Sequence, residues 1–251
     1  MENQLCLNCS SQVHGKFCAN CGQKTNTHRI TMVHFIAHDL LHGTFHFDRG
    51  ILFTLKEALV RPGRAALDYI GGKRIRYYNV FYLSLILIGV VLILSHSGNE
   101  NAVEGADESS REAIDFFTKN IKLIVLGFVP LLAINSKILF WKLKLNLAEH
   151  FIVGGFTFVG VLAMMNLFVG ANTIVQLTSA GEASEYVLLV LLLAWLLFPF
   201  WAYCNLAWKT HSVLGILWRL VAFYILLFVE LITITGLVLW LVTGKTDMVI
   251  S

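Results

Sequence analysis

The stretch FIVGGFTFVGVLAMMNLFVGA, residues 151–171, decides the fold class of this chain. It carries no charged side chain, and it matches the roughly 20 residues that a helix needs to cross a bilayer. Similar apolar runs stand before and after it, and the ranges predicted to cross are 80–96, 121–141, 151–171, 186–206 and 220–242. The fold class predicted is therefore an all-α integral membrane protein with five transmembrane helices.

The composition agrees with a membrane protein. Of the 251 residues, 57% are hydrophobic and 14% are charged, whereas a soluble domain has about 25% charged residues. The apolar runs all fall within residues 79–251, so this range is predicted to form the transmembrane bundle and residues 1–78 a polar head. The net charge of +3 is too small to indicate nucleic acid as a partner. The oligomeric state is left open.

The distribution of lysine and arginine predicts how the chain crosses the membrane, because these residues favour the cytosolic side. They gather in the head, in the connection 141–149 and in the connection 207–212, whereas the other two connections are acidic or neutral. No export signal is visible at the N-terminus. We therefore expect a multi-pass protein of a bacterial inner membrane, with its N-terminus in the cytosol and its C-terminus outside.

Two CxxC pairs, CLNC and CANC, open the head. Four thiolates suit the tetrahedral coordination of Zn²⁺, and each CxxC turn directs both of its sulfur atoms to one point. The predicted metal ligands are Cys6, Cys9, Cys18 and Cys21, which would form a structural zinc ribbon over residues 1–28. Two disulfides are the alternative, and they require an oxidising compartment. The fifth cysteine, Cys204, lies in an apolar run and is expected to be a small buried residue.

Residues 29–78 are predicted to form amphipathic helices that lie on the inner leaflet. One helix would begin near Thr31, a second would span 54–60 with Thr54 and Glu57 as a capping box, and a third would span 64–70. Basic residues in this range are expected to bind anionic lipid headgroups, each adding about 1 kcal/mol of attraction. They are Arg61, Arg64, Lys73, Arg74 and Arg76.

Several motifs in the head resemble an uncharacterised bacterial family whose domain has no known function. They are CxNC…FCxxCGQ, HDLLHGTFHFDRG and TLKEALVRPGRAALDYIGGKRIRYYN, and the resemblance is densest from Cys6 to about Phe81. It implies a zinc ribbon, a motif-rich segment and several membrane helices. The triplet Glu149-His150-Phe151 also resembles a family feature, but the GGFTF after it departs from the His- and aromatic-rich continuation expected there. The family carries no established activity, so the resemblance implies architecture alone.

Histidines recur every fourth residue from His34 onward, a spacing that places neighbours on one helix face. One interpretation is a polar face at the level of the headgroups. The other is a cluster that holds a second metal or moves protons, since the predicted orientation brings further histidines and acids to the same side. The candidates are His38, Asp39, His42, His46, Asp48, Glu149, His150 and His211.

Glu230 is the other residue that the sequence singles out. It lies eleven residues after Arg219, which is expected to mark the membrane surface, and so about 16 Å deeper along a helix. An acid at that depth usually faces the interior of a bundle or a water path. A proton-linked role and a purely structural hydrogen bond to Thr233, Asn166 or a backbone carbonyl both remain open.

Three classes of function are compatible with these features. The preferred one is a scaffold or regulatory protein whose zinc ribbon binds a cytosolic protein at the inner leaflet. The first alternative is an enzyme of the membrane interface that acts on a lipid or lipid-linked substrate through the His/Asp cluster. The second alternative is a small transporter that uses Glu230, although no internal repeat supports it. Whether the chain is an enzyme is therefore left undecided.

Overall fold

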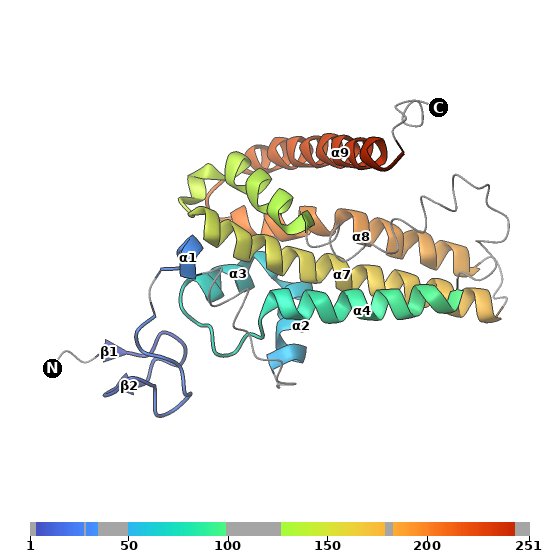
Figure 1. Cartoon of the computed structure of the whole chain (residues 1–251). Helices are drawn as coiled ribbons and strands as arrows, with labels where there is room; N and C mark the ends of the chain where they lie inside the picture. Colours follow the sequence, from blue (N-terminus) through green and yellow to red (C-terminus); the bar gives the residue numbers. More distant parts are fainter. Residues whose placement is uncertain (1–3, 28, 35–49, 99–126, 179–182, 244–251) are drawn as a thin grey trace.

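The computed structural model describes residues 4–27, 29–34, 50–98, 127–178 and 183–243 (Figure 1). These residues are mostly helical. The exception is an antiparallel hairpin near the N-terminus, in which β1 (Gln4–Leu5) pairs with β2 (Gln12–Val13) and Gln4 lies opposite Val13. The mostly helical architecture agrees with the fold class predicted from the apolar runs.

Five apolar helices form the bundle. They are α4 (Val80–Gly98), the helix Gly127–Leu139, α7 (Leu147–Thr178), α8 (Ala183–Ala207) and α9 (Val213–Thr243). Within the described residues, α7, α8 and α9 are long and apolar enough to cross a membrane, and the apolar parts Val80–Ser95 and Gly127–Leu139 are shorter. Residues 121–126 of the second predicted crossing lie outside the described residues. Three candidate crossings are therefore present, and the number five remains a prediction.

Helix α7 occupies the centre of the bundle, where every residue from Ile152 to Ala163 is buried. Small residues bring its neighbours close, as is usual between membrane helices. A Cβ atom at Gly155 would lie 2.7 Å from Cγ2 of Val80, and one at Gly160 would lie 2.1 Å from the Phe198 ring. Gly155 and Gly160, both within the stretch 151–171, therefore set how closely α4 and α8 pack on α7.

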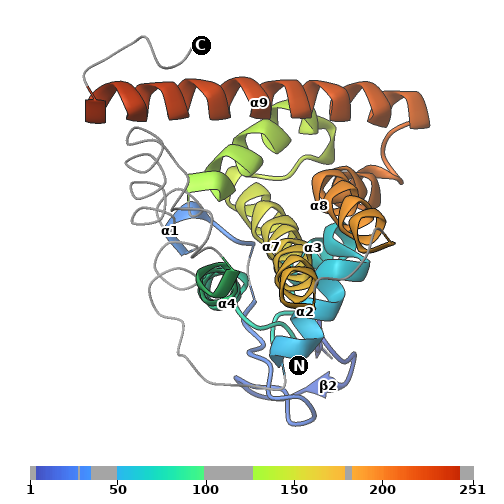
Figure 2. The ribbon, with the colours of Figure 1, turned by 90° about the vertical axis from the view of Figure 1, so that its right-hand side faces the viewer.

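Helix α9 lies across the others. Figure 2 shows α4, α7 and α8 nearly end-on, whereas α9 is seen along its length. Its buried side is a stripe of Ile216, Leu220, Phe223 and Leu227. Arg219 lies within this helix, and its buried side chain donates through Nε to the Leu139 carbonyl at 2.9 Å. The helix thus begins at Val213, seven residues before the predicted crossing, because Arg219 binds within the protein rather than interrupting the helix.

Two short helices precede the bundle, α2 (Gly50–Val60) and α3 (Pro62–Ile70), and both pack against α7. The predicted capping box at Thr54 is wrong, because α2 begins a turn earlier. Thr54 is buried inside the helix, where its hydroxyl accepts a hydrogen bond of 2.7 Å from the Tyr78 amide. Proline at the first helical position explains why α3 begins two residues before the prediction.

The cysteine-containing part of the head, which ends at Arg29 and is called the head from here on, lies at one end of the bundle (Figure 1). The same end holds the first turns of α4 and α7, the last turn of α8, and α2 with α3. The connections 140–146 and 208–212 lie there too, because the first leads into α7 and the second follows α8. They also contact each other, since the rings of Phe140 and His211 are 5.9 Å apart between centroids. The segments that the basic residues predicted to share one compartment therefore share one end of the molecule.

Candidate metal centre and its attachment to the bundle

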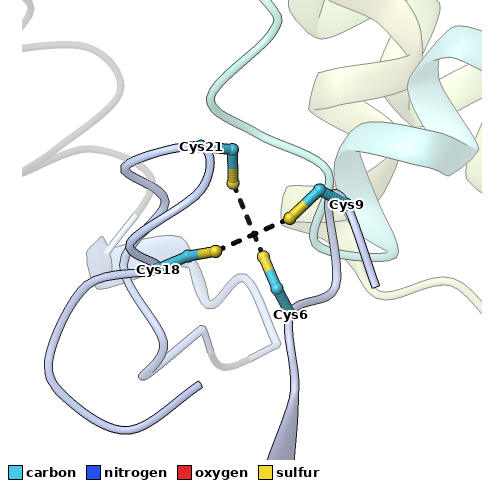
Figure 3. A group of neighbouring side chains, drawn as sticks. All are labelled: Cys6, Cys9, Cys18 and Cys21. Atoms are coloured by element: carbon cyan, nitrogen blue, oxygen red, sulfur yellow. Dashed lines mark hydrogen bonds between the residues drawn. The ribbon is translucent and has the colours of Figure 1, made fainter. Parts of the chain in front are cut away.

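The four cysteines of the two CxxC pairs converge on one point (Figure 3). Their sulfur atoms all lie within 4.8 Å of one another, and they are the one group of three or more candidate metal ligands among the described residues. The Sγ atoms of Cys6 and Cys21 are 3.6 Å apart, and those of Cys9 and Cys18 are 3.5 Å apart. A tetrahedron of sulfurs with bonds of about 2.3 Å to its centre has edges of about 3.8 Å. The arrangement therefore fits one bound metal ion.

The same distances argue against the disulfide alternative, since a disulfide requires about 2.05 Å between sulfurs. All four cysteines are free thiols in the structure. Hydrogen bonds with Ser11 lower the pKa of Cys9 to about 6, whereas the pKa of Cys18 is raised to about 11. The cysteine prediction is thus supported as a metal site, whereas the identity of the metal belongs to the proposal below.

Each CxxC pair builds the same backbone turn. The amide of Ser10 donates to the Cys6 carbonyl at 2.9 Å, and the amide of Gly22 donates to the Cys18 carbonyl at 2.8 Å. Both Ser10 and Gly22 have positive φ angles, 61° and 73°, which a glycine adopts without strain. The glycine after the second pair, Gly22, therefore adopts this turn without strain.

Residues inside the two turns attach the head to the loop before α4. The side chain of Asn8, between two cysteines, accepts from Nε of Arg76 at 2.8 Å, and the Asn8 carbonyl accepts from Nη2 at 2.8 Å. Gln23, two residues after Cys21, is buried, and its amide group donates to the Gly72 carbonyl at 2.6 Å. Its side-chain oxygen accepts from the amide of Arg74 at 3.1 Å. The folded metal turns thus hold the residues that lead into the first apolar helix.

A second attachment joins the end of the head to the start of α7. Arg29 donates through Nε and Nη2 to the two oxygens of Glu149, at 2.7 and 2.8 Å, and this pairing raises the pKa of Arg29. Glu149 also caps its own helix, since it accepts from the amide of Asn146 while the Asn146 side chain accepts from the Glu149 amide. This reciprocal capping box places a buried carboxylate where Arg29 can bind it.

Sequence reasoning missed Asn8, Gln23, Arg29 and Asn146 as binding residues. A signal existed for Asn146 alone, because Asn-Leu-Ala-Glu before an apolar run is the pattern of a capping box. The partners of the other three are about 50 to 120 residues away in the chain, and no local pattern indicates them. These three binding residues can be identified only from the folded structure, in which the head lies against the bundle.

The basic residues predicted to bind lipid headgroups mostly have partners within the protein. Arg61 pairs with Glu57 and lies 3.5 Å from Asp68, and Lys73 pairs with Asp68 at 2.7 Å. The guanidinium of Arg74 lies over the Tyr69 ring at 5.8 Å, and Arg76 binds Asn8. The side chain of Arg64 is exposed. Headgroup binding by these five residues remains a prediction, and four of them also stabilise the loop and α3.

A comparison with protein families identifies the segment that contains this loop. The model of a family described as "Protein of unknown function (DUF3667)" matches residues 48–88. The match covers α2, α3, the loop that binds Asn8 and Gln23, and the first half of α4. It does not include the four cysteines. No curated protein matches the chain, and no solved structure does.

The match supports the resemblance to an uncharacterised family over residues 48–88 only. The matched segment holds the partners of Asn8 and Gln23: the side chain of Arg76 donates to Asn8, and the Gly72 carbonyl accepts from Gln23. The zinc-ribbon motif lies outside the match and is supported by the sulfur geometry alone.

The structure places some of the predicted histidine cluster and leaves the rest outside the described residues. His38, Asp39, His42, His46 and Asp48 all fall in 35–49 and lie outside. His150 is fully buried, and its Nδ1 shares a hydrogen bond of 2.8 Å with the Ser136 hydroxyl. Its Nε2 has no hydrogen-bond partner among the described residues. Glu149 binds Arg29 instead of joining His150, so the second metal site remains a hypothesis.

His211 lies in the connection between α8 and α9, with Nδ1 2.9 Å from the Thr210 hydroxyl. Glu230 accepts a hydrogen bond of 2.7 Å from the buried amide of Asn135, on the helix Gly127–Leu139. The partners expected for Glu230 were wrong in detail. Thr233 donates to the Glu230 backbone carbonyl, and Asn166 donates to Leu87 and Leu162. The acid therefore joins α9 to a neighbouring helix, which neither supports nor removes a role in proton movement.

Proposed function

We propose that this chain is a multi-pass membrane protein whose head binds one structural zinc ion and holds a cytosolic protein at the inner leaflet. Four thiolates in tetrahedral array are the usual ligands of structural zinc. Such a site has no open coordination position for a substrate, so catalysis at the metal is not part of the proposal. The observation that carries it is a closed metal site attached to the bundle by Asn8, Gln23 and Arg29.

The head is also suited to bind a protein because it exposes apolar side chains beside the metal. Phe17, between the two CxxC pairs, is 58% exposed, and Leu5 is 57% exposed. Buried aromatic anchors contribute much of the binding energy in protein interfaces. An exposed aromatic ring on a small metal-held hairpin therefore offers an anchor for a partner.

The proposed orientation places the head, with the connections 141–149 and 207–212, in the cytosol of a bacterium, and the C-terminus outside. What supports it is the excess of lysine and arginine in these segments and their position at one end of the bundle. An odd number of crossings brings the two termini to opposite sides, and the proposal counts α4, the helix that contains Gly127–Leu139, α7, α8 and α9. It requires α9, which lies across the other helices in the structure, to run beside them in the membrane.

A photo-crosslinking residue at position 17 of the full-length chain is expected to capture one soluble protein in intact membranes. The same residue at Tyr186, exposed at the opposite end of the bundle, is expected to capture none. Replacing Cys18 and Cys21 by serine should abolish the capture, since the hairpin depends on its metal. Equal capture at both positions, or none at position 17, would contradict the scaffold.

An enzyme acting on lipid is a second candidate, and His150 favours it. This imidazole is fully buried, with Nδ1 bonded to Ser136 and Nε2 without a partner among the described residues, so Nε2 is available to accept a proton or to bind a metal. This function would replace the scaffold if position 17 captured no protein while the intact chain changed the lipid composition of its membrane.

A further inference from the structure

Four lysines at the head end of the bundle are exposed. Lys137 lies in the last turn of the helix Gly127–Leu139, Lys142 and Lys144 follow it, and Lys209 follows α8. We call these four residues the lysine rim. Among the described residues, none of the four has a carboxylate within 4.0 Å. This contrasts with the arginines and lysine of 61–76, most of which bind groups of the protein.

The two segments that carry the rim meet in space. The ring of Phe140 contacts the ring of His211 at a centroid distance of 5.9 Å, and Arg219 donates to the carbonyl of Leu139. Burial lowers the pKa of His211, and the positive charges of Arg219 and Lys142 lower it further. The connections 140–144 and 208–212 therefore form one positively charged surface. The buried guanidinium of Arg219 lies beneath it and adds a further positive charge.

Three tryptophans are exposed in these segments or in the start of α9. Trp141 is 66% exposed, Trp208 is 62% exposed and Trp218 is 53% exposed. Tryptophan rings gather at the level of lipid headgroups, because one end of the ring is apolar and the other carries an N–H donor. The mixture of free ammonium groups and open indole rings is typical of a surface that meets the boundary between headgroups and acyl chains.

Apolar side chains continue from this surface along the outside of the bundle. On α8 they include Leu197 and Trp201, both about half exposed or more. A lipid whose phosphate lies on the rim would have its acyl chains beside these residues. A soluble anion or an acidic peptide would leave them uncovered, so the continuity of the two surfaces favours a lipid.

We propose that the lysine rim, together with Trp141, Trp208 and Trp218, binds the phosphate-bearing headgroup of anionic phospholipids. This inference rests on the proposed function, in which the bundle spans a membrane and this end faces the inner leaflet. It moves the principal lipid contact from the arginines of 61–76 to the lysines of the rim, which have no acidic partner in the described residues.

The test compares two variants of the full-length protein with the same change of charge. In the rim variant Lys137, Lys142 and Lys209 are replaced by glutamine. In the control variant three exposed lysines elsewhere are replaced by glutamine, namely Lys16, Lys24 and Lys56. Each protein is purified in detergent with equal amounts of phosphatidylglycerol and phosphatidylcholine, and the lipid retained after gel filtration is measured by mass spectrometry.

The wild type is expected to retain phosphatidylglycerol in preference to phosphatidylcholine, and the rim variant to lose this preference by about tenfold or more. The control variant should retain this preference. Excess inorganic phosphate should not displace the lipid, because phosphate has no acyl chain that can contact the exposed tryptophan rings. An equal loss in both variants, or displacement by phosphate alone, would overturn the proposal. Failure of the membrane assignment itself would show separately, as a chain that stays in solution without detergent.

Discussion

Replacing Cys18 and Cys21 by serine is expected to release the head from the bundle and to expose the loop 71–76 to protease. The hairpin is too small to form a core, so the metal supplies most of its folding energy; zinc-finger peptides gain about 10–16 kcal/mol from their metal. Loss of the metal unfolds the turns that position Asn8 and Gln23. The loop then loses its hydrogen bonds at Gly72, Arg74 and Arg76.

Trypsin measures this release, because Lys73, Arg74 and Arg76 all lie in the loop. We expect cleavage there to be at least about tenfold faster in the double variant, and treatment of the wild type with a strong chelator to have the same effect. Replacing the fifth cysteine, Cys204, by serine is the control, since it lies in α8 away from the metal centre. Cleavage at the wild-type rate in the double variant would show that the metal does not hold the head to the bundle.

Replacing Gly63 by alanine is expected to cause a large loss of stability for a single methyl group. The new Cβ would lie 2.4 Å from the Leu206 nitrogen and 2.7 Å from the Ala202 carbonyl oxygen. Both atoms belong to the backbone of α8, which cannot turn aside as a side chain can. Helix α3 would therefore be pushed away from α8, and overpacking of this kind costs about 1–3 kcal/mol or more.

The matched control is Gly89→Ala in α4, where a Cβ has nothing within 4 Å. Alanine is a better helix former than glycine by about 1 kcal/mol, so this variant should be neutral or slightly stabilised. The midpoint of thermal unfolding in detergent measures both. Equal midpoints for the two variants would mean that α3 does not pack on α8 at the distance that the structure gives.

Helix positions could be predicted from the sequence because each apolar run carries its own signal. The run 186–206 lies within α8 (Ala183–Ala207), and 151–171 lies within α7. The direction of α9 could not be predicted in this way. Its apolar residues show that it avoids water, but its course across the bundle depends on tertiary contacts such as Arg219 with Leu139 and Glu230 with Asn135.

The metal centre could be predicted for a related reason. All four ligands lie within sixteen residues, from Cys6 to Cys21, and the CxxC spacing itself makes the turns. The attachments of the head could not, because Asn8 and Gln23 are ordinary polar residues whose partners lie some 50 to 70 residues away. The predicted capping box at Thr54 failed because burial of the helix outweighed a local pattern.

The central claim is that a metal-held head lies in the cytosol at one end of a membrane bundle. Two reporters fused in turn before Met1 test it most directly in bacterial cells: a fluorescent protein that matures only in the cytosol, and alkaline phosphatase, which is active only outside it. The account predicts bright cells with the first reporter and no phosphatase activity with the second. Phosphatase activity with dark cells would place the cysteines and the lysine rim on the outer side, and it would contradict the account.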